Sequence, residues 1–130
     1  IYLDTNFFFL CHFDQTEKGE KAGKLLAEIV KGRQAITSSL TLDEVMWVTI
    51  KNKRSAELRS VIEEIYATPN LTVKEVGTGI PLAALNIMEE HGLKPRDAFH
   101  AAVMKNFGVN EIVSDDSDFD KVKWIKRIKL

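Results

Sequence analysis

The sequence predicts an α/β fold, more specifically a three-layer α/β/α sandwich built around a mainly parallel central sheet. Short apolar runs typical of strands alternate along the chain with longer segments of helical periodicity. No repeat, low-complexity tract or linker interrupts this alternation. At 130 residues the chain has the length of one domain, and we expect residues 1–130 to form a single domain.

The first half of the chain is expected to contain two strands and four helices. Ile1–Leu3 is a short apolar run that stops at Asp4, and Asn6 is a suitable cap for the helix that follows. Gly32 ends the second helix, and the later helices carry apolar residues at helical spacing. The expected strands are residues 1–3 and 34–37, and the expected helices are residues 7–13, 16–31, 38–51 and 54–67.

The second half is expected to contain three strands and two helices. Residues 71–76 alternate between apolar and polar side chains, as a half-buried strand does. Pro81 suits the first turn of one helix, Pro95 precedes the other, and Gly92 and Gly108 end them. The expected strands are residues 71–76, 111–114 and 123–130, and the expected helices are residues 81–91 and 96–107.

Composition excludes several classes of protein. The net charge of −1 means that nucleic-acid binding must depend on local basic patches rather than on a global positive field. A single cysteine, Cys11, excludes a disulfide framework and a cysteine-rich zinc site, and it favours a reducing, cytoplasmic location. No apolar run approaches the ~18 residues of a membrane span, so no membrane association is expected. Because the chain does not start with Met, we expect one or a few residues before Ile1.

Acidic side chains from four separate segments are expected to meet at one edge of the sheet. Asp4 follows the first strand, and Asp116 follows the fourth strand, with Asp118 two residues further on. Glu44 and Asp97 lie near the starts of two helices. Active sites of open parallel sheets lie beyond the carboxyl ends of the strands, so these segments can place their carboxylates in one cleft.

A cluster of this kind favours a bound divalent cation. Ionised carboxylates in one cleft repel one another, and a cation removes that penalty. Oxygen ligands suit Mg²⁺ or Mn²⁺ rather than Zn²⁺. Such a cation polarises a phosphoryl oxygen and lowers the pKa of a bound water. The cluster therefore predicts a Mg²⁺- or Mn²⁺-dependent enzyme that hydrolyses phosphodiester bonds.

Each acid also has a local interpretation. Asp4 is a possible turn or cap residue, and Thr41 with Glu44 matches a capping box. Asp97 complements a helix dipole, and residues 114–118 form a possible solvated loop. The functional interpretation is favoured because all four local explanations would have to place acids at the same edge of the sheet by coincidence.

Four motifs together resemble the PIN domain family, in particular the small VapC-like toxin ribonucleases. The opening segment Ile1–Asn6 is similar to the family's apolar run that ends in Asp and continues to Asn or Ser. Ser38–Val45 resembles its passage from strand to helix and into a glutamate. Arg96–Ala102 and Ile112–Phe119 resemble its third and final acidic motifs. The order and spacing of these motifs make the resemblance specific, and it covers essentially the whole chain.

The resemblance implies a metal-dependent endoribonuclease, with Mg²⁺ or Mn²⁺ held by Asp4, Glu44, Asp97 and Asp116. Asp118 is implied as a fifth, more variable ligand. The substrate is then RNA, and a single-stranded substrate is expected because unpaired RNA exposes its bases. The family also implies that the chain is the toxin of a VapBC-type toxin–antitoxin pair, with an antitoxin protein as a possible partner.

Further residues near the acids are candidates for roles in the site. Thr5, Asn6 and Ser114 carry hydroxyl or amide groups that can position a water or a phosphate. His100 lies three residues after Asp97, on the same helix face. We favour a packing role for His100, or a role in holding Asp97, over direct contact with a phosphate.

Two surfaces are candidates for interactions. The helical segments between Thr16 and Ala67 carry more apolar positions than one sheet face requires, and they predict a homodimer or antitoxin surface. The C-terminal stretch is the most basic part of the chain. Its side chains follow an RNA backbone or protect an edge strand from aggregation, and the sequence does not separate these roles. They are Lys121, Lys123, Lys126, Arg127 and Lys129.

Two alternative functions remain open at this stage. A non-catalytic PIN-like scaffold, or RNA-docking module, would keep the acids without using them for chemistry. A phosphatase would use Asp4 as a covalent nucleophile. The phosphatase is less favoured, because Asn6 stands where such enzymes carry a second acid.

Overall fold

The computed structural model describes all 130 residues and contains five strands, six α-helices and two 3-10 helices. The strands are β1 (Tyr2–Leu3), β2 (Ala35–Ser38), β3 (Leu71–Lys74), β4 (Glu111–Val113) and β5 (Lys126–Ile128). The α-helices are α1 (Thr5–Phe13), α2 (Glu17–Val30), α3 (Ser39–Lys51), α4 (Leu58–Ala67), α5 (Ile80–His91) and α6 (Pro95–Asn106). The 3-10 helices are η1 (Ser55–Glu57) and η2 (Ser117–Lys121). None of the helices is both long enough and apolar enough to cross a membrane.

All five strands are parallel and form one sheet in the order β3-β2-β1-β4-β5. Tyr2 of β1 is in register with Ile36 of β2 on one side and with Ile112 of β4 on the other. The chain therefore builds the sheet outward from β1 through β2 to β3, and then returns to the other side of β1 to place β4. The reversal makes the gap between β1 and β4 the topological switch point, where open parallel sheets bind ligands.

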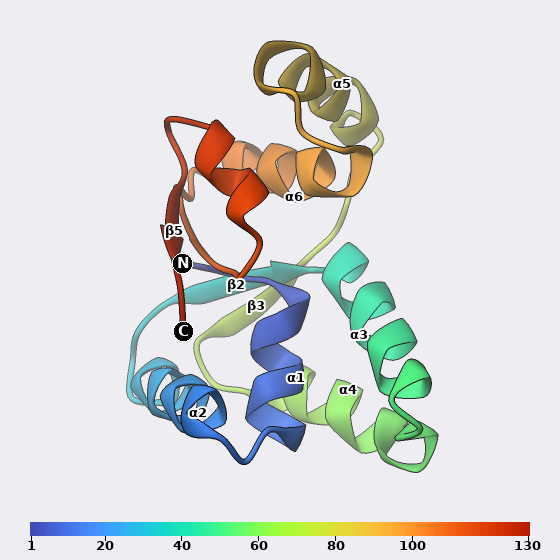
Figure 1. The fold of residues 1–130 in the computed structure, drawn as a ribbon, viewed down its shortest axis with the longest axis vertical. Helices are drawn as coiled ribbons and strands as arrows, with labels where there is room; N and C mark the ends of the chain where they lie inside the picture. Colours follow the sequence, from blue (N-terminus) through green and yellow to red (C-terminus); the bar gives the residue numbers. More distant parts are fainter.

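Helices cover both faces of the sheet, so the predicted three-layer α/β/α fold is confirmed (Figure 1). Alternate residues of each strand point to opposite faces. Tyr2 and Ile112 contribute to the core beneath α5 and α6. Leu3 and Val113 contribute to the second core, beneath α1, α2, α3 and α4. Burial on both faces explains why the central strands read as short continuous apolar runs.

Two expected helix starts differ from the structure by more than one residue. The first helix begins at Thr5 rather than Phe7, because Asp4 and not Asn6 serves as its N-cap and accepts a hydrogen bond from the Thr5 amide. The helix expected over residues 54–67 is divided into η1 and α4. Its start is displaced because Lys53 adopts a left-handed conformation, with φ of 59°, and η1 then turns the chain into α4.

The strand ends also differ from expectation. The strand expected over residues 71–76 ends at Lys74, and the one expected over residues 123–130 forms only over Lys126–Ile128. Between β4 and β5 the chain instead folds into η2, which the apolar pattern did not indicate. Asp116 starts η2 by accepting a hydrogen bond from the Asp118 amide at 2.9 Å.

Candidate active site

A cleft of about 340 Å³ opens at the carboxyl ends of β1 and β4, beside the middle of α3 and the first turns of α6. All four acids that the sequence singled out line this cleft. Asp118 lies beside them, because one carboxylate oxygen each of Asp97, Asp116 and Asp118 falls within 4.8 Å of the others. The ten lining residues are Asp4, Thr5, Asn6, Glu44, Trp47, Val48, Arg96, Asp97, His100 and Asp116.

Asp4 is fixed at the point where β1 passes into α1. One carboxylate oxygen accepts a hydrogen bond from the Thr5 amide at 2.7 Å, and the other accepts one from the Ser114 hydroxyl at 2.7 Å. The same Ser114 oxygen accepts a hydrogen bond from the Asp116 amide at 3.1 Å. Ser114 therefore ties the end of β4 to the end of β1 and sets the spacing of the two acids that follow these strands.

Glu44 lies in the second turn of α3 and points into the cleft. Ser38 caps this helix by accepting a hydrogen bond from the Thr41 amide, so the capping box between Thr41 and Glu44 does not form. One Glu44 oxygen instead accepts the hydroxyl hydrogen of Thr5 at 2.5 Å. The other lies 3.0 Å from Nε2 of His100 and 3.3 Å from Nε of Arg96.

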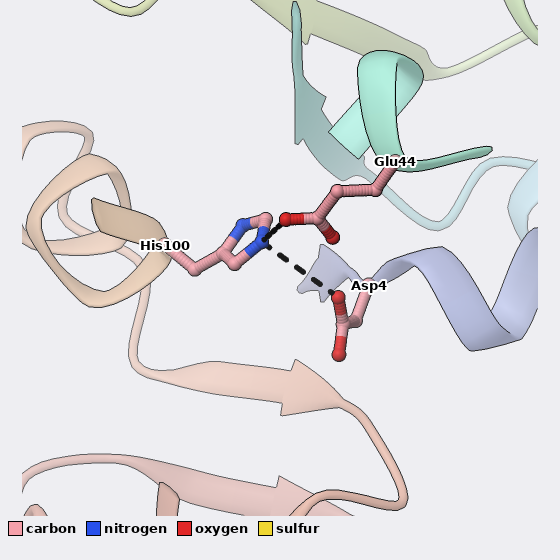
Figure 2. Close-up of side chains that lie close together, drawn as sticks. All are labelled: Asp4, Glu44 and His100. Atoms are coloured by element: carbon pink, nitrogen blue, oxygen red, sulfur yellow. Dashed lines mark hydrogen bonds and ion pairs between the residues drawn. The ribbon is translucent and has the colours of Figure 1, made fainter. Parts of the chain in front are cut away.

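His100 projects from α6 between Glu44 and Asp4, as Figure 2 shows, with its Nε2 atom 4.0 Å from an Asp4 oxygen. The ring is 1% exposed, and its Nδ1 atom lies 2.7 Å from the hydroxyl of Tyr2. That hydroxyl also lies 2.8 Å from Oγ of Ser38. The imidazole is thus held at both nitrogens, which fits a role in holding an acid, although the acid it contacts is Glu44 rather than Asp97.

The contact between Glu44 and His100 changes the pKa of both groups. Burial alone would raise the pKa of Glu44, but hydrogen bonds from His100 and Thr5 and the charge of Arg96 lower it overall. Burial alone would lower the pKa of His100, but its hydrogen bond to Glu44 and the charges of Asp4, Glu44 and Asp97 raise it overall. Both shifts favour an imidazolium paired with a carboxylate in the cation-free protein.

The acids on the other side of the cleft are less well compensated. Burial and the neighbouring charge of Asp116 raise the pKa of Asp97 to about 6. Asp116 accepts a hydrogen bond from the Asp118 amide, and neither Asp97 nor Asp116 forms an ion pair; Nζ of Lys121 lies 3.2 Å from Asp118. Negative charge therefore accumulates at Asp97 and Asp116.

The residues present fit a hard divalent cation. Carboxylate oxygens are the ligands that Mg²⁺ and Mn²⁺ prefer. The five carboxylates lie in two groups, each with its ligand atoms within 4.8 Å of one another: Asp4 and Glu44 with His100, and Asp97 with Asp116 and Asp118. Burial and the charge of Asp116 raise the pKa of Asp97, and the charge of His100 offsets this only in part. A cation between these oxygens would remove the repulsion that raises it.

The other predicted site residues have different contacts. Thr5 lines the cleft and donates to Glu44, and Ser114 bridges Asp4 and Asp116, as described above. Asn6 also lines the cleft, and its amide donates to an Asp115 oxygen at 2.9 Å. Lys18 of α2 contacts the same Asp115 oxygen at 2.7 Å, so an ion pair holds the group that orients Asn6.

Besides Val48, which lines the cleft, three residues of this region were not singled out from the sequence. Trp47 lines the cleft with 66% of its surface exposed, and its position three residues after Glu44 on one helix is a signal that sequence spacing does contain. Arg96 precedes Asp97 directly and is the only arginine or lysine that lines the cleft. Tyr2 gave no such signal, because strand alternation predicts its burial but not its contact with His100.

The basic C-terminal stretch is largely engaged with acids on its own side of the sheet. Arg127 forms an ion pair with Asp120 at 2.8 Å and donates to the backbone oxygen of Ser114 at 3.3 Å. Lys126 lies 3.6 Å from Glu111. Because β5 is an edge strand, these contacts favour the protection of an edge over contact with RNA.

Comparison with known proteins identifies the family. The PIN domain family model matches residues 1–125. This chain belongs to the PIN domain family. It is 23% identical over 129 residues to Ribonuclease VapC13 of Mycobacterium tuberculosis (strain ATCC 25618 / H37Rv), an alignment that covers 98% of each protein.

Solved structures share the fold at low sequence identity. The crystal structure of Mycobacterium tuberculosis VapC20, a Sarcin-Ricin loop cleaving toxin, matches with a TM-score of 0.76 and 20% identity over 92% of each chain. A toxin-antitoxin complex from Klebsiella pneumoniae matches with a TM-score of 0.70 and 19% identity over 96% of this chain and 94% of that chain. The resemblance inferred from the sequence motifs is thereby confirmed, and neither the scaffold nor the phosphatase alternative is favoured.

Proposed function

We propose that this PIN domain protein is a metal-dependent endoribonuclease and the toxin of a VapBC-type toxin–antitoxin pair. The observation that carries the proposal is the meeting of Asp4, Glu44, Asp97 and Asp116, from four separate segments, in one cleft at the switch point of the sheet. Family membership and the ribonuclease relatives support the same chemistry.

The proposed cation is Mg²⁺ or Mn²⁺, held by the four acids of the cleft together with Asp118. When bound, it supplies a Lewis acid that stabilises the charge developing on a phosphodiester. The chain's own residues organise the ligands. Ser114 and the Thr5 amide hold both oxygens of Asp4, while the Thr5 hydroxyl and His100 hold Glu44. The ligands are therefore positioned before substrate binds.

Single-stranded RNA is the proposed substrate. The cleft carries four acids, so RNA phosphates are repelled until a cation neutralises this charge, and RNA binding should be weak without metal. Trp47 offers an exposed indole at the cleft on which an unpaired base can stack. Asn6 adds an amide that Asp115 orients and that can hold a phosphate or a water.

An antitoxin protein is the proposed partner. A hollow of about 400 Å³ lies between α3 and α4, within the helical region that the sequence indicated as an interaction surface. Met46, Leu58 and Ile62 supply its apolar lining, and the exposed Ile50 extends the apolar surface on α3. The toxin-antitoxin complex among the structural matches supports this partner. A homodimer and a cytoplasmic location are also part of the proposal.

The test is cleavage of RNA by the purified protein. Total RNA and a labelled oligoribonucleotide are incubated with Mn²⁺ or Mg²⁺, with EDTA, and with the Asp4→Asn variant. Cleavage is expected only with cation and only with Asp4 intact. The matched control is Asp43→Asn, an exposed acid next to Glu44 that does not line the cleft. RNA left intact under all conditions would favour the scaffold, and full activity of Asp4→Asn would remove the site assignment.

A further inference from the structure

A second hollow adjoins the active-site cleft around the first turn of α6. Its volume is about 430 Å³, and it is lined by Leu40, Lys94, Pro95, Arg96 and Phe99. Arg96 lines both hollows, and its Nε atom lies 3.3 Å from an oxygen of Glu44. The two hollows therefore share Arg96, whose guanidinium group is paired with Glu44.

The lining combines an aromatic ring with two cations. Phe99 is half-buried and packs against the core beneath α5 and α6, which fixes the ring while part of it faces the hollow. Leu40 and Pro95 complete an apolar wall. Lys94 is exposed and forms no ion pair, so its charge is available to a ligand. An apolar wall beside free positive charge matches a nucleotide, which pairs a flat base with an anionic phosphate.

We propose that this hollow binds the nucleotide next to the scissile phosphodiester, with its base against Phe99 and its phosphate between Lys94 and Arg96. The inference rests on the proposed ribonuclease function and adds a substrate subsite to it. Two observations carry it: Arg96 lines both the hollow and the acidic cleft, and the other charged residue of the hollow, Lys94, is opposite in charge to the acids of the cleft. Because the cleft repels phosphates, the protein needs positive charge beside it to hold the RNA backbone.

The base contact is tested with a chemical double-mutant cycle. Cleavage sites are first mapped by sequencing total RNA digested with Mn²⁺, and an oligoribonucleotide that spans one site becomes the substrate. Abasic ribose is then placed at each flanking position in turn. At one position the abasic substrate should lower kcat/KM of the unaltered protein about tenfold. Phe99→Leu should cost a similar factor on the intact substrate, and the two losses should not add.

The phosphate contact is tested with Lys94→Ala, a change at an exposed residue that is not expected to affect folding. This variant should raise KM and reduce the slope of log KM against log salt by about 0.7, the value for one contact with single-stranded nucleic acid. Matched controls lie at the far end of α6: Lys105→Ala for the charge and Phe107→Leu for the ring. Neither control should change the ratio of kcat/KM between the intact and the abasic substrate. Neither should change the slope of log KM against log salt.

The outcomes separate the subsite from the function on which it rests. Total RNA that stays intact with Mn²⁺ would overturn the ribonuclease and the subsite together. Cleavage in which the Phe99→Leu and abasic losses multiply, with an unchanged salt slope for Lys94→Ala, would overturn the subsite alone. Variants that cleave RNA normally but bind the antitoxin weakly would show that the hollow takes a peptide, which also overturns it.

Discussion

The two sides of the acidic cleft are built differently. On the side of β1 and α3, protein donors contact Asp4 and Glu44 at both carboxylate oxygens. On the side of α6 and η2, Asp97 and Asp116 form no ion pair, and the pKa of Asp97 rises to about 6. The protein neutralises one side of the cleft with its own groups and leaves negative charge on the other.

The difference indicates where binding energy for a cation comes from. A carboxylate that already accepts hydrogen bonds is well positioned but gains less from a new positive charge. A carboxylate that is repelled by its neighbours gains more, because the cation removes the repulsion. We therefore expect the first side to set the geometry of the site and the second side to supply most of the affinity.

Asp97→Asn gives the largest expected effect on activity, a loss of at least about 10³-fold, because it removes a proposed ligand. The same change should stabilise the cation-free protein, since it removes a charge that the fold disfavours. Allowing for solvent screening, we expect about 1 kcal/mol, or about 3 °C in Tm. Cleavage assays and thermal unfolding in EDTA measure the two effects.

The matched variant on the first side is Glu44→Gln. It should abolish cleavage equally but lower Tm in EDTA, because Glu44 carries stabilising contacts with His100 and Arg96. Two variants that shift Tm in the same direction would show that the two sides do not differ.

Tyr2→Phe tests whether the position of Glu44 depends on the buried contact between the Tyr2 hydroxyl and His100. The change removes the hydroxyl that contacts Nδ1 of His100 and leaves that nitrogen without a partner, while Ser38 loses one contact and keeps its hydrogen bond from the Thr41 amide. We expect a loss of about 1 kcal/mol in unfolding free energy and about tenfold in kcat. Unchanged kcat, measured alongside Tm, would mean that Glu44 keeps its position without this contact.

The pH dependence of cation binding tests the second side. With a pKa of about 6, Asp97 is ionised in about a quarter of molecules at about pH 5.5 and in nearly all at about pH 7.5. Affinity for Mn²⁺ should therefore fall about fourfold on acidification, as titration calorimetry can measure. In Asp97→Asn the fall should be smaller, and an equal fall would assign the effect to another group.

The same pKa shifts give the sign of the stability change without cation. The pKa of Asp97 is higher in the folded protein than in the unfolded chain, so its contribution to the free energy of unfolding is fully present below its ordinary pKa. This contribution is lost as pH rises through about 6. His100, whose pKa is also raised, acts in the same direction. Glu44, whose pKa is lowered, loses its contribution only in more acidic solution. In EDTA, Tm should therefore fall between about pH 5.5 and about pH 7.5, and saturating Mn²⁺ should reverse the fall.

Lys121→Ala gives the smallest expected effect. Lys121 is half-exposed and forms a surface ion pair with Asp118, so its loss should change unfolding free energy by less than about 0.5 kcal/mol. Affinity for Mn²⁺ should rise by no more than about twofold. A large rise in Mn²⁺ affinity would show that Lys121 already neutralises the acids beside α6 and η2. The two sides of the cleft would then not differ as described.

The acids could be placed from the sequence because their positions follow from local patterns. Asp4 comes directly after an apolar run, Asp116 follows shortly after another, and the carboxyl ends of parallel strands share one edge. The sequence could not predict which of these acids would be held by hydrogen bonds from the protein and which would not. That difference depends on contacts such as Tyr2 with His100 and Ser114 with Asp4, which join distant parts of the chain and leave no periodic signal.

The predicted start of α1 was wrong for a related reason. A cap is decided by which side chain reaches a free backbone amide, and several polar residues near a helix start compete for it. Asp4 rather than Asn6 caps α1, so this helix begins earlier than expected, whereas α3, capped by Ser38, begins within one residue of its expected start. The residue that loses the competition is then free for another role, as Asn6 is in the cleft.

The position of β1 between β2 and β4 has a consequence for protein synthesis. The first strand acquires its second neighbour only after four more helices and another strand have been made. A ribosome must therefore release most of the polypeptide before Asp116 can reach Asp4. Prematurely terminated products that stop short of β4 lack one wall of the cleft, and they should be inert towards the RNA that surrounds them.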